Sequence, residues 1–258
     1  MNEKELINYY NKFNEDKRLN TKHGSIEYLT AIKYIEKYLN KLNNPKILDI
    51  GAGTGKYSNY FQNKGYETTA VELIKHNLKV IEQKNKNIKT YLANATNLSM
   101  FQDNSFDIIL LFGPMYHLIS EKEKLQALSE AKRIIKKEGY IFISYCMNEY
   151  AIITHAFKEK FIQENIKNKQ IDNNFHIISS PKDLYSYVRL KDINKLNKKL
   201  KLKRIKIIAQ DGPTEYLKKE INKMDEKTFN LFLQYHYKTC ENKNLLEASR
   251  HLLDIIQK

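Results

Sequence analysis

The chain of 258 residues has a net charge of +14, with 41% hydrophobic and 29% charged residues. This length and composition suffice for one large α/β domain with room for an insertion. No apolar segment approaches the ~20 residues that span a bilayer, and the N-terminus lacks the apolar stretch of a secretory signal. The two cysteines, Cys146 and Cys240, form no metal-ligand spacing. We therefore expect no membrane anchorage and a reduced, cytoplasmic setting.

The positive charge is weak evidence for nucleic acid as a partner. Only five of the 44 basic residues are arginine, and the excess of Lys, Asn and Ile is what an AT-rich genome produces at tolerant surface positions. The lysines are scattered except in residues 195–206, where leucines and isoleucines supply an apolar side. Nucleic acid therefore stays an alternative partner that the sequence does not favour.

The first 45 residues contain two helical patterns, at about 3–16 and 25–41, and we expect them to form an N-terminal helical segment. Residues 46–146 then alternate short β-type runs with helical stretches. The expected strands of this core are 46–50, 67–73, 88–93, 106–112 and 140–146. The helical stretches begin near Lys56, Lys75 and Glu121. This alternation predicts βαβ units and a parallel sheet with right-handed crossovers.

The alternation breaks after the core. Residues 147–190 are expected to form an inserted cap over the strand ends, where ligands of open α/β sheets bind. The cap contains a helical stretch and two expected strands, at 149–170, 175–179 and 184–190. Residues 191–258 complete the core sheet with added helices. Their expected elements are a helix over 191–200, a strand over 204–210, helices over 214–223 and 226–241, and a last strand from 251.

The stretch ILDIGAGTGKYS ends a strand at Asp49 and then places three glycines at alternate positions. Such a turn brings bare backbone against a ligand before a helix begins. Glu72 ends the next strand, where a carboxylate commonly binds ribose hydroxyls. The Asp49 carboxylate would repel the pyrophosphate of a dinucleotide, but it suits an ammonium and a sulfonium. The pattern therefore favours S-adenosyl-L-methionine over NAD.

Five segments of the core follow one another in a characteristic order: ILDIGAGTGKYS, VEL, LANATNL, DNSFDIILLFGPMYHL and EAKRIIKKEGYIFIS. On these segments the chain resembles the class I S-adenosylmethionine-dependent methyltransferases, of the small-molecule type 11 kind. The resemblance implies an α/β fold with a Rossmann-like, seven-stranded, mostly parallel sheet and helices on both faces. It also implies that the last strand, HLLDIIQ, inserts antiparallel. S-adenosyl-L-homocysteine would be the product.

The resemblance also implies which residues bind the cofactor. Asp49 and the turn would hold the methionine part, Glu72 the ribose hydroxyls, and Asn94 would replace the usual Asp as acceptor for the adenine amino group. Arg18 would pair with the methionine carboxylate, or else belong to a solvated helix face. Phe112 would border the sulfonium, or else only pack in the core. The full expected set is Tyr10, Arg18, Asp49, Gly51, Ala52, Gly53, Gly55, Glu72, Leu73, Asn94, Ala95, Phe112 and Gly113.

The segment FGPMYHL lies where the reacting methyl group faces its acceptor in this family. Enzymes that methylate nucleic-acid amines often have an Asn or Asp acceptor at the first position, whereas Gly113 has no side chain. Methyl transfer is an in-line displacement, and it needs a base only where the acceptor must lose a proton. His117 is the candidate base, or else a polar helix cap. Tyr116 lines the substrate pocket, or else only packs there.

We expect substrate recognition by Tyr145, Tyr187 and Arg189, with His155 and Tyr185 as further candidates in the cap. A rare arginine among lysines suits an acidic substrate group. An ordinary surface ion pair explains Arg189 equally well.

No His, Cys or acidic cluster stands out, and Asp107 begins its strand at the wrong end of the sheet for a magnesium site. We therefore expect no metal. The leading hypothesis is methyl transfer to O or N of a small molecule. The alternatives are an RNA or ribosome-associated methyltransferase and a non-catalytic cofactor-binding protein. The sequence determines neither the acceptor nor the oligomeric state.

Overall fold

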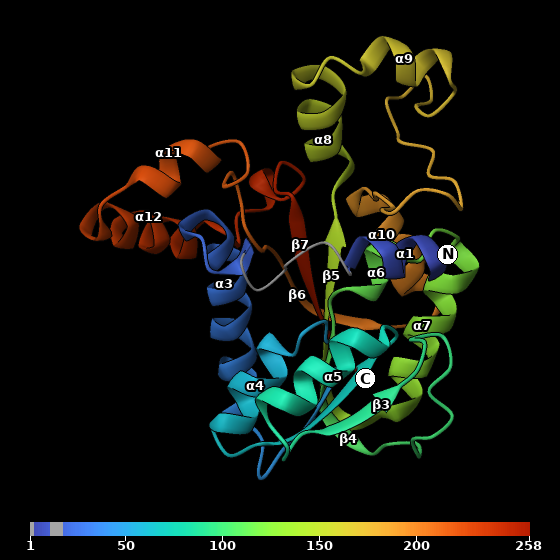
Figure 1. Ribbon diagram of the computed structural model, residues 1–258, viewed down its shortest axis with the longest axis vertical. Helices are drawn as coiled ribbons and strands as arrows, with labels where there is room; N and C mark the ends of the chain where they lie inside the picture. The colour runs from blue at the N-terminus through green and yellow to red at the C-terminus, as the bar shows by residue number, and fades with distance from the viewer. Residues whose placement is uncertain (1–2, 11–17) are drawn as a thin grey trace.

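Seven strands form one sheet within residues 3–10 and 18–258, which are the residues that this computed structural model describes (Figure 1). Their order across the sheet is β3-β2-β1-β4-β5-β7-β6. The strands span Lys46–Ile50 (β1), Glu67–Glu72 (β2), Lys89–Leu92 (β3), Phe106–Leu111 (β4), Ile135–Cys146 (β5), Lys203–Ala209 (β6) and His251–Gln257 (β7).

Helices connect the strands and extend beyond the sheet. Those up to β5 span Glu3–Tyr10 (α1), Lys22–Leu39 (α3), Lys56–Asn63 (α4), Lys75–Lys84 (α5), Pro114–His117 (α6) and Glu121–Ile134 (α7). Those after β5 span Asn148–Ala151 (α8), Ile152–Lys158 (the π-helix η1), Ile162–Lys167 (α9), Leu190–Lys199 (α10), Lys218–Lys223 (α11), Glu226–Thr239 (α12) and Lys243–Leu245 (the 3-10 helix η2). A capping box formed by Ser120 and Glu123 fixes the start of α7.

The central strands are nearly continuous apolar runs, as expected for strands that are buried on both faces of a parallel sheet. β1 pairs in parallel with β2 and β4, β2 pairs with β3, and β4 pairs with β5. β7 lies antiparallel between β5 and β6. The expected Rossmann-like, mostly parallel sheet with an antiparallel last strand is therefore confirmed.

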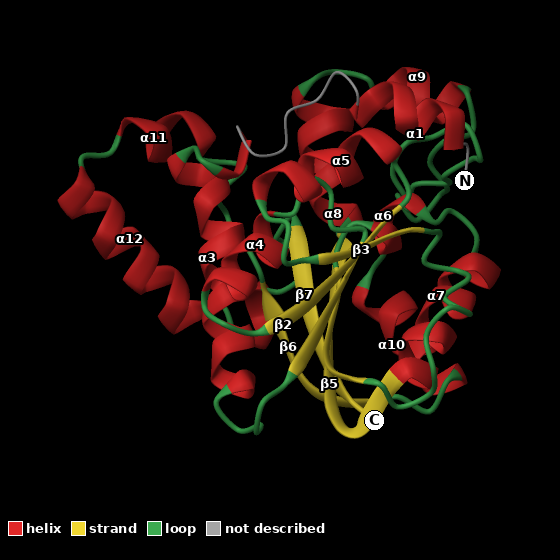
Figure 2. Ribbon diagram, turned by 60° about the horizontal axis from the view of Figure 1, so that its bottom comes forward, coloured by secondary structure: helices red, strands yellow, loops and turns green. Residues whose placement is uncertain are grey.

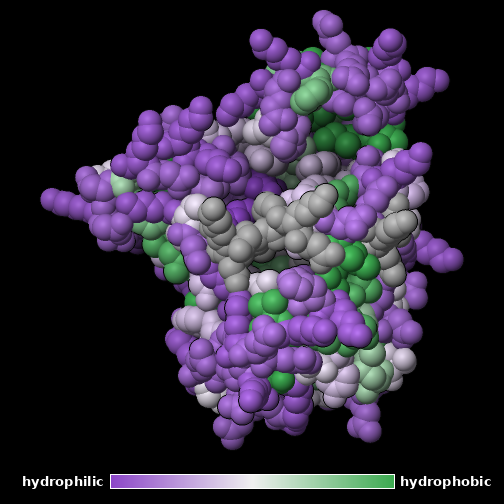
Figure 3. Space-filling view, viewed as in Figure 1, coloured by the Kyte–Doolittle hydropathy of each residue, from purple (hydrophilic) through white to green (hydrophobic). Residues whose placement is uncertain are grey.

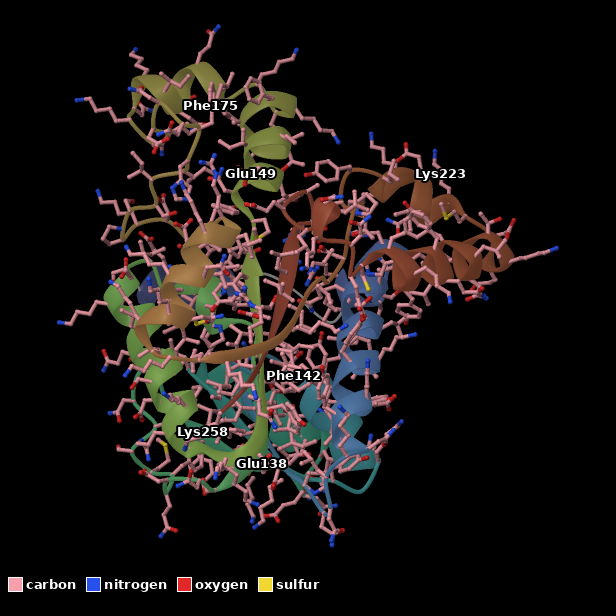
Figure 4. All side chains as sticks on the ribbon, turned by 180° about the vertical axis from the view of Figure 1, so that it is seen from behind. Glu138, Phe142, Glu149, Phe175, Lys223 and Lys258 are labelled. Carbon is pink, nitrogen blue, oxygen red and sulfur yellow. The ribbon has the colours of Figure 1, made fainter. Side chains whose placement is uncertain are left out.

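Helices cover both faces of this sheet. α3 and α4 lie on one side, and α7 and α10 lie on the other (Figure 2). Phe142, in the middle of β5, is fully buried at the centre of the molecule (Figure 4). A smaller core, formed by Ile26, Ile221 and Phe229, joins α11 and α12 to α3. Both helices therefore extend sideways from α3 rather than from the sheet (Figure 1).

The strands expected in the core form close to their predicted bounds, except that β5 begins at Ile135 rather than 140. The extra residues stay extended because Ile135 pairs with Phe106 at the start of β4, across a register shift. Helix α7 therefore runs into β5 without an intervening loop.

Residues 147–190, called the cap segment below, rise above the carboxyl ends of the strands (Figure 1). Both strands expected there, at 175–179 and 184–190, are wrong. Only the single bridges Ile171–Ile177 and Met147–Val188 form, because these residues lie beyond the sheet and have no strand edge to pair with. The cap segment is instead built from short helices and turns.

Two helical expectations are too long. The stretch 149–170 is divided into α8, η1 and α9, and only α11 forms within 214–223. Of the helix expected over 3–16, the structure describes Glu3–Tyr10 as α1, and the rest lies outside the described residues.

None of the described helices is both long and apolar enough to cross a membrane. The cytoplasmic location and the four-part division of the chain stay predictions.

Candidate active site

The glycine turn after β1 takes a backbone shape that other residues rarely adopt. Gly51, Gly53 and Gly55 have φ angles of 71°, 57° and 81°. A Cβ on Gly51 would lie 2.6 Å from Cδ of Pro114, the first residue of α6. The bare backbone therefore lets the turn pack directly against the start of α6.

Two buried carboxylates flank this turn. Asp49 accepts a hydrogen bond from Oγ of Ser58 at 2.6 Å. Glu72 accepts from the backbone N–H of Gly53 at 2.7 Å and from that of Ile74 at 2.9 Å. Burial raises the pKa of Asp49 to about 6 and that of Glu72 to about 7. Glu72 thus ties the glycine turn to the end of β2.

A cavity, called the first cavity below, lies at the carboxyl ends of β1, β2 and β4. All of the expected cofactor residues line it except Arg18 and Gly55, and so do Tyr116 and His117. Its volume is only about 130 Å³, below the ~300–1,000 Å³ of most small-molecule sites. Side chains over it, such as Leu6 of α1, must therefore move to admit a nucleoside.

Arg18 does not reach the first cavity. Its Nη1 donates to Oε2 of Glu27 at 2.7 Å, and its side chain is largely buried. Glu27 itself lines the cavity. The expected pairing of Arg18 with the methionine carboxylate is therefore replaced by an ion pair within the protein. Gly55 faces Ile81 of α5 instead of the cavity.

Comparison with known proteins bears on the same region. Residues 48–143 match the family model of the methyltransferase domain. Residues 48–143 are a methyltransferase domain. They contain the glycine turn, Glu72 and α6, and so most of the first cavity. The chain has the class I methyltransferase fold.

Several individual proteins to which this chain is similar carry methyltransferase names, and their sequence identity to it is low. A demethylmenaquinone methyltransferase of Paenarthrobacter aurescens is 32% identical over 99 residues, 38% of each chain. The chain spans half or less of the length of the curated relatives that it matches first. A structure from Thermotoga maritima, described as a possible histamine N-methyltransferase, covers 97% of this chain and 98% of its own, with a TM-score of 0.61 and 17% identity.

A second similar structure was solved with two bound ligands. It is the Burkholderia thailandensis 1,6-didemethyltoxoflavin-N1-methyltransferase with bound 1,6-didemethyltoxoflavin and S-adenosylhomocysteine. It covers 92% of this chain and 79% of its own, with a TM-score of 0.53 and 12% identity. At these sequence identities, the likeness to both solved structures shows the fold and nothing more.

Asn94 of the methyltransferase domain lines the first cavity, but its carbonyl oxygen already has partners. Oδ1 accepts from the backbone N–H of Thr96 at 3.0 Å and from Oγ1 of Thr96 at 2.9 Å. The side chain thus caps its own turn. The adenine amino group would have to share this oxygen, which corrects the simple replacement of Asp by Asn expected from the sequence.

His117 is buried, and hydrogen bonds fix its ring. Nδ1 donates to the carbonyl oxygen of Leu184 at 2.8 Å, so Nε2 accepts from the hydroxyl of Tyr10 at 2.7 Å. Burial lowers the pKa of His117 to about 4. The sequence argument assumed an ordinary pKa, which is wrong for this ring. His117 is neutral near pH 7, and it lines the first cavity together with Tyr10.

Sequence reasoning missed Glu27 of α3, which faces the first cavity from a different side than Asp49. Burial alone would raise the pKa of Glu27, but the charges of Arg18 and His251 lower it to about 2. Nothing in the helical pattern of α3 distinguishes this glutamate from its solvated neighbours. The other lining residues that were missed are Leu6, Leu19, Thr54, Lys56, Tyr57, Ile74, Asn77, Ala93, Pro114 and Leu118.

For two of the three residues expected to contact the substrate, the structure corrects the expectation. Tyr145 is fully buried inside the sheet and lines no cavity found in the described residues. Nε of Arg189 donates to Glu149 at 2.6 Å, and Nη2 donates to the carbonyl oxygen of Phe175 at 3.1 Å, so this arginine holds the cap segment together (Figure 4). Tyr187 does line a cavity beside the cap segment.

A cluster of Glu27, Asp211 and His251 comes together from three distant segments. Nδ1 of His251 lies 2.7 Å from Oδ2 of Asp211 and 3.6 Å from Oε2 of Glu27. Burial opposes the charge on this ring, yet the two carboxylates help to raise the pKa of His251 well above its usual value. A protonated imidazole cannot ligate a metal, and Arg18 adds a further cation. The absence of a metal stays a prediction.

Proposed function

We propose that this chain is an S-adenosylmethionine-dependent methyltransferase that methylates O or N of a small molecule. The observation that carries the proposal is the charge of the first cavity. Among the described residues, three carboxylates line it, those of Glu27, Asp49 and Glu72, against one cationic side chain, that of Lys56. A ligand with a sulfonium, an ammonium and ribose hydroxyls matches this set of acceptors.

A dinucleotide is a poor alternative. Its pyrophosphate would have to lie against the glycine turn, beside Asp49. The buried carboxylate would repel the two negative phosphates strongly, because the local dielectric constant is low. NAD therefore serves as the control ligand below.

The bound cofactor would supply a methyl group on a sulfonium. An O or N lone pair of the acceptor would attack this methyl group in line with the C–S bond, which breaks as the new bond forms. The residues of this chain position the two reactants and exclude water. For an acceptor that also loses a proton, the first cavity offers the Tyr10 hydroxyl, which can pass its own proton to Nε2 of His117. Gly113 contributes only its backbone, so no side chain there binds an amine.

A small-molecule acceptor is favoured over RNA for two reasons. The Paenarthrobacter and Burkholderia proteins are named for small-molecule substrates. In addition, Gly113 has no side chain that could accept a hydrogen bond from a nucleic-acid amine. RNA stays the alternative because of the net charge of +14.

Calorimetric titration of the chain with S-adenosylhomocysteine tests the proposal, with NAD as control. We expect micromolar binding of S-adenosylhomocysteine and none of NAD. Labelled S-adenosylmethionine and a cell extract then report methyl transfer, separately in the small-molecule and the RNA fraction. A preference for NAD would overturn the proposal, and label that appears only in RNA would replace the acceptor class.

Cofactor binding should weaken as the pH falls. The carboxyl group of Glu72, with a pKa of about 7, and that of Asp49, with a pKa of about 6, accept hydrogen bonds and attract cations best when ionised. We therefore expect S-adenosylmethionine to bind roughly tenfold more weakly at pH 5.5 than at pH 8. Calorimetry at both values measures this ratio. Equal affinities would mean that both groups are already ionised at pH 5.5.

A further inference from the structure

A second cavity, of about 680 Å³, lies beside the first and falls within the ~300–1,000 Å³ of small-molecule sites. The cap segment forms one side of it, and α11 with the loop before it forms the other. These are the two lobes above the sheet in Figure 1, and hydrophobic side chains gather below the hydrophilic tip of the cap segment (Figure 3). Among the described residues, none lines both cavities.

Aromatic rings separate the two cavities. Tyr10, Tyr116 and His117 line the first cavity, and Tyr9 and Tyr185 line the second. The rings of Tyr9 and Tyr10 are 5.1 Å apart, and those of Tyr116 and Tyr185 are 5.8 Å apart. The five side chains form what we call the aromatic wall. A ligand in the second cavity therefore lies next to the place where the methyl group would be, on the far side of the wall.

The two cavities have opposite charges. The first has three carboxylates and one lysine, as described above. Within the part of the chain that the structure describes, the second has five cationic side chains against three carboxylates, not counting His155. The cations are Arg18, Lys158, Lys218, Lys219 and Arg250, and the carboxylates are Glu159, Glu215 and Glu220. A cationic cofactor on one side and an anionic ligand on the other would match this division.

Two of the five arginines of this lysine-rich chain line the second cavity. Arg250 donates to Glu215 at 2.6 Å, and Arg18 donates to Glu27 at 2.7 Å. The charge of Arg18 also acts unfavourably on Arg250, so the two guanidinium groups lie within electrostatic range. An anion between them would relieve this repulsion, and the planar guanidinium suits a carboxylate. The other three arginines are also held in ion pairs, but they line neither cavity: Arg133, Arg189 and Arg204.

Tyrosines supply the rest of the surface of the second cavity. The rings of Tyr150 and Tyr216 meet edge to face, with centroids 5.8 Å apart, and the guanidinium of Arg250 lies 5.6 Å from the Tyr150 centroid. The hydroxyl of Tyr216 is buried and has no hydrogen-bond partner within the described part of the chain. Burial raises the pKa of Tyr150 to about 12, so its hydroxyl stays a donor at neutral pH. The cavity thus offers aromatic faces and donors.

We propose that the second cavity binds the methyl acceptor and that this acceptor is a small aromatic acid. Its ring packs against Tyr150 and Tyr187, and its carboxylate pairs with Arg250. The atom to be methylated reaches the methyl group when the side chains of the aromatic wall move aside, because in-line transfer requires direct contact. The proposal rests on the proposed function and adds the substrate class and its site. Neutral and cationic aromatic molecules of the same size would lack the partner for Arg250.

Three matched probes test this proposal in calorimetric titrations of the full chain saturated with S-adenosylhomocysteine. They are 4-hydroxybenzoate, the neutral 4-hydroxybenzamide and the cationic 4-hydroxybenzylamine. We expect the acid to bind at least about tenfold more tightly than the amide, as one charged hydrogen-bonded pair provides. The preference should vanish in Arg250→Gln and persist in Lys227→Gln, a control on the exposed start of α12.

Arg250→Gln removes the arginine partner of the largely buried Glu215 and can unfold the chain, so a rim variant provides a second test. Lys218→Gln combined with Lys219→Gln removes two exposed cations. It should lower the preference for the acid roughly threefold and make it less dependent on salt. Equal binding of acid and amide, stronger binding of the amine, or no binding of the acid would overturn the proposal. Failure of S-adenosylhomocysteine to bind is measured first and would instead overturn the proposed function.

Discussion

Glu72→Gln is expected to weaken the binding of S-adenosylhomocysteine by about 100-fold. The proposed role of Glu72 is to accept hydrogen bonds from two ribose hydroxyls, and each bond to a charged acceptor contributes about 1.5–3 kcal/mol. Gln keeps one carbonyl oxygen, which can still accept from the N–H of Gly53. The amide NH2 of Gln would face the N–H of Ile74, so this bond is lost and about 1–3 kcal/mol of stability with it. Thermal unfolding measures that cost, and calorimetric titration of the folded variant measures the loss of ligand binding.

Glu67→Gln is the matched control, because Glu67 begins the same strand, β2, at its opposite and exposed end. Its partners are Lys46 and Lys89 at the surface. We expect an affinity within twofold of the original chain. Equal affinities of the Glu72 and Glu67 variants would show that Glu72 only supports the turn and does not bind the ligand.

Arg204→Met is expected to lower the free energy of unfolding by about 3–5 kcal/mol. Arg204 of β6 donates from Nε and Nη2 to the two oxygens of Asp254, at 2.6 Å and 2.9 Å. Asp254 lies in β7 with none of its surface exposed. Without the arginine, only Asn197 would still donate to this buried carboxylate. Denaturant titration and a fall of roughly 10 °C in the melting temperature measure the loss.

Lys206→Met provides the comparison on the same strand. The ion pair of Lys206 with Glu241 is partly exposed, so its loss should cost less than about 1 kcal/mol. Combining Arg204→Met with Asp254→Leu should recover much of the stability, because no charge is then left in the core. If Arg204→Met costs no more than Lys206→Met, the buried pair does not stabilise the insertion of β7.

The sequence by itself determined the sheet and the position of the first cavity. Parallel strands that are buried on both faces require continuous apolar runs, and these runs mark β1, β4 and β5 directly. The turn after β1 requires glycine because of its positive φ angles, and Glu72 follows from the spacing of adjacent parallel strands. Such features are local in the chain or repeat along it, so they are visible without a structure.

The cap segment was predicted poorly for the opposite reason. Its β-like runs were assigned as strands, but a strand needs a partner edge, and no sheet edge lies beside residues 175–179. The sequence predicts that Arg189 binds the substrate, because arginine is rare in this chain. Its actual partner, Glu149, lies within reach only once the cap segment has folded. Propensity and composition do not say which partner a side chain finds.

Only the tertiary structure decided the charges and protonation of the site. Tyr10 and His117 are 107 residues apart in the chain, and their hydrogen bond, together with burial, turns an ordinary histidine into a neutral one. Glu27 reaches the first cavity because α3 packs beside the sheet. Arg250 reaches the second because β7 inserts antiparallel. Burial and long-range contacts set the energies of ionised groups, and both exist only after the chain has folded.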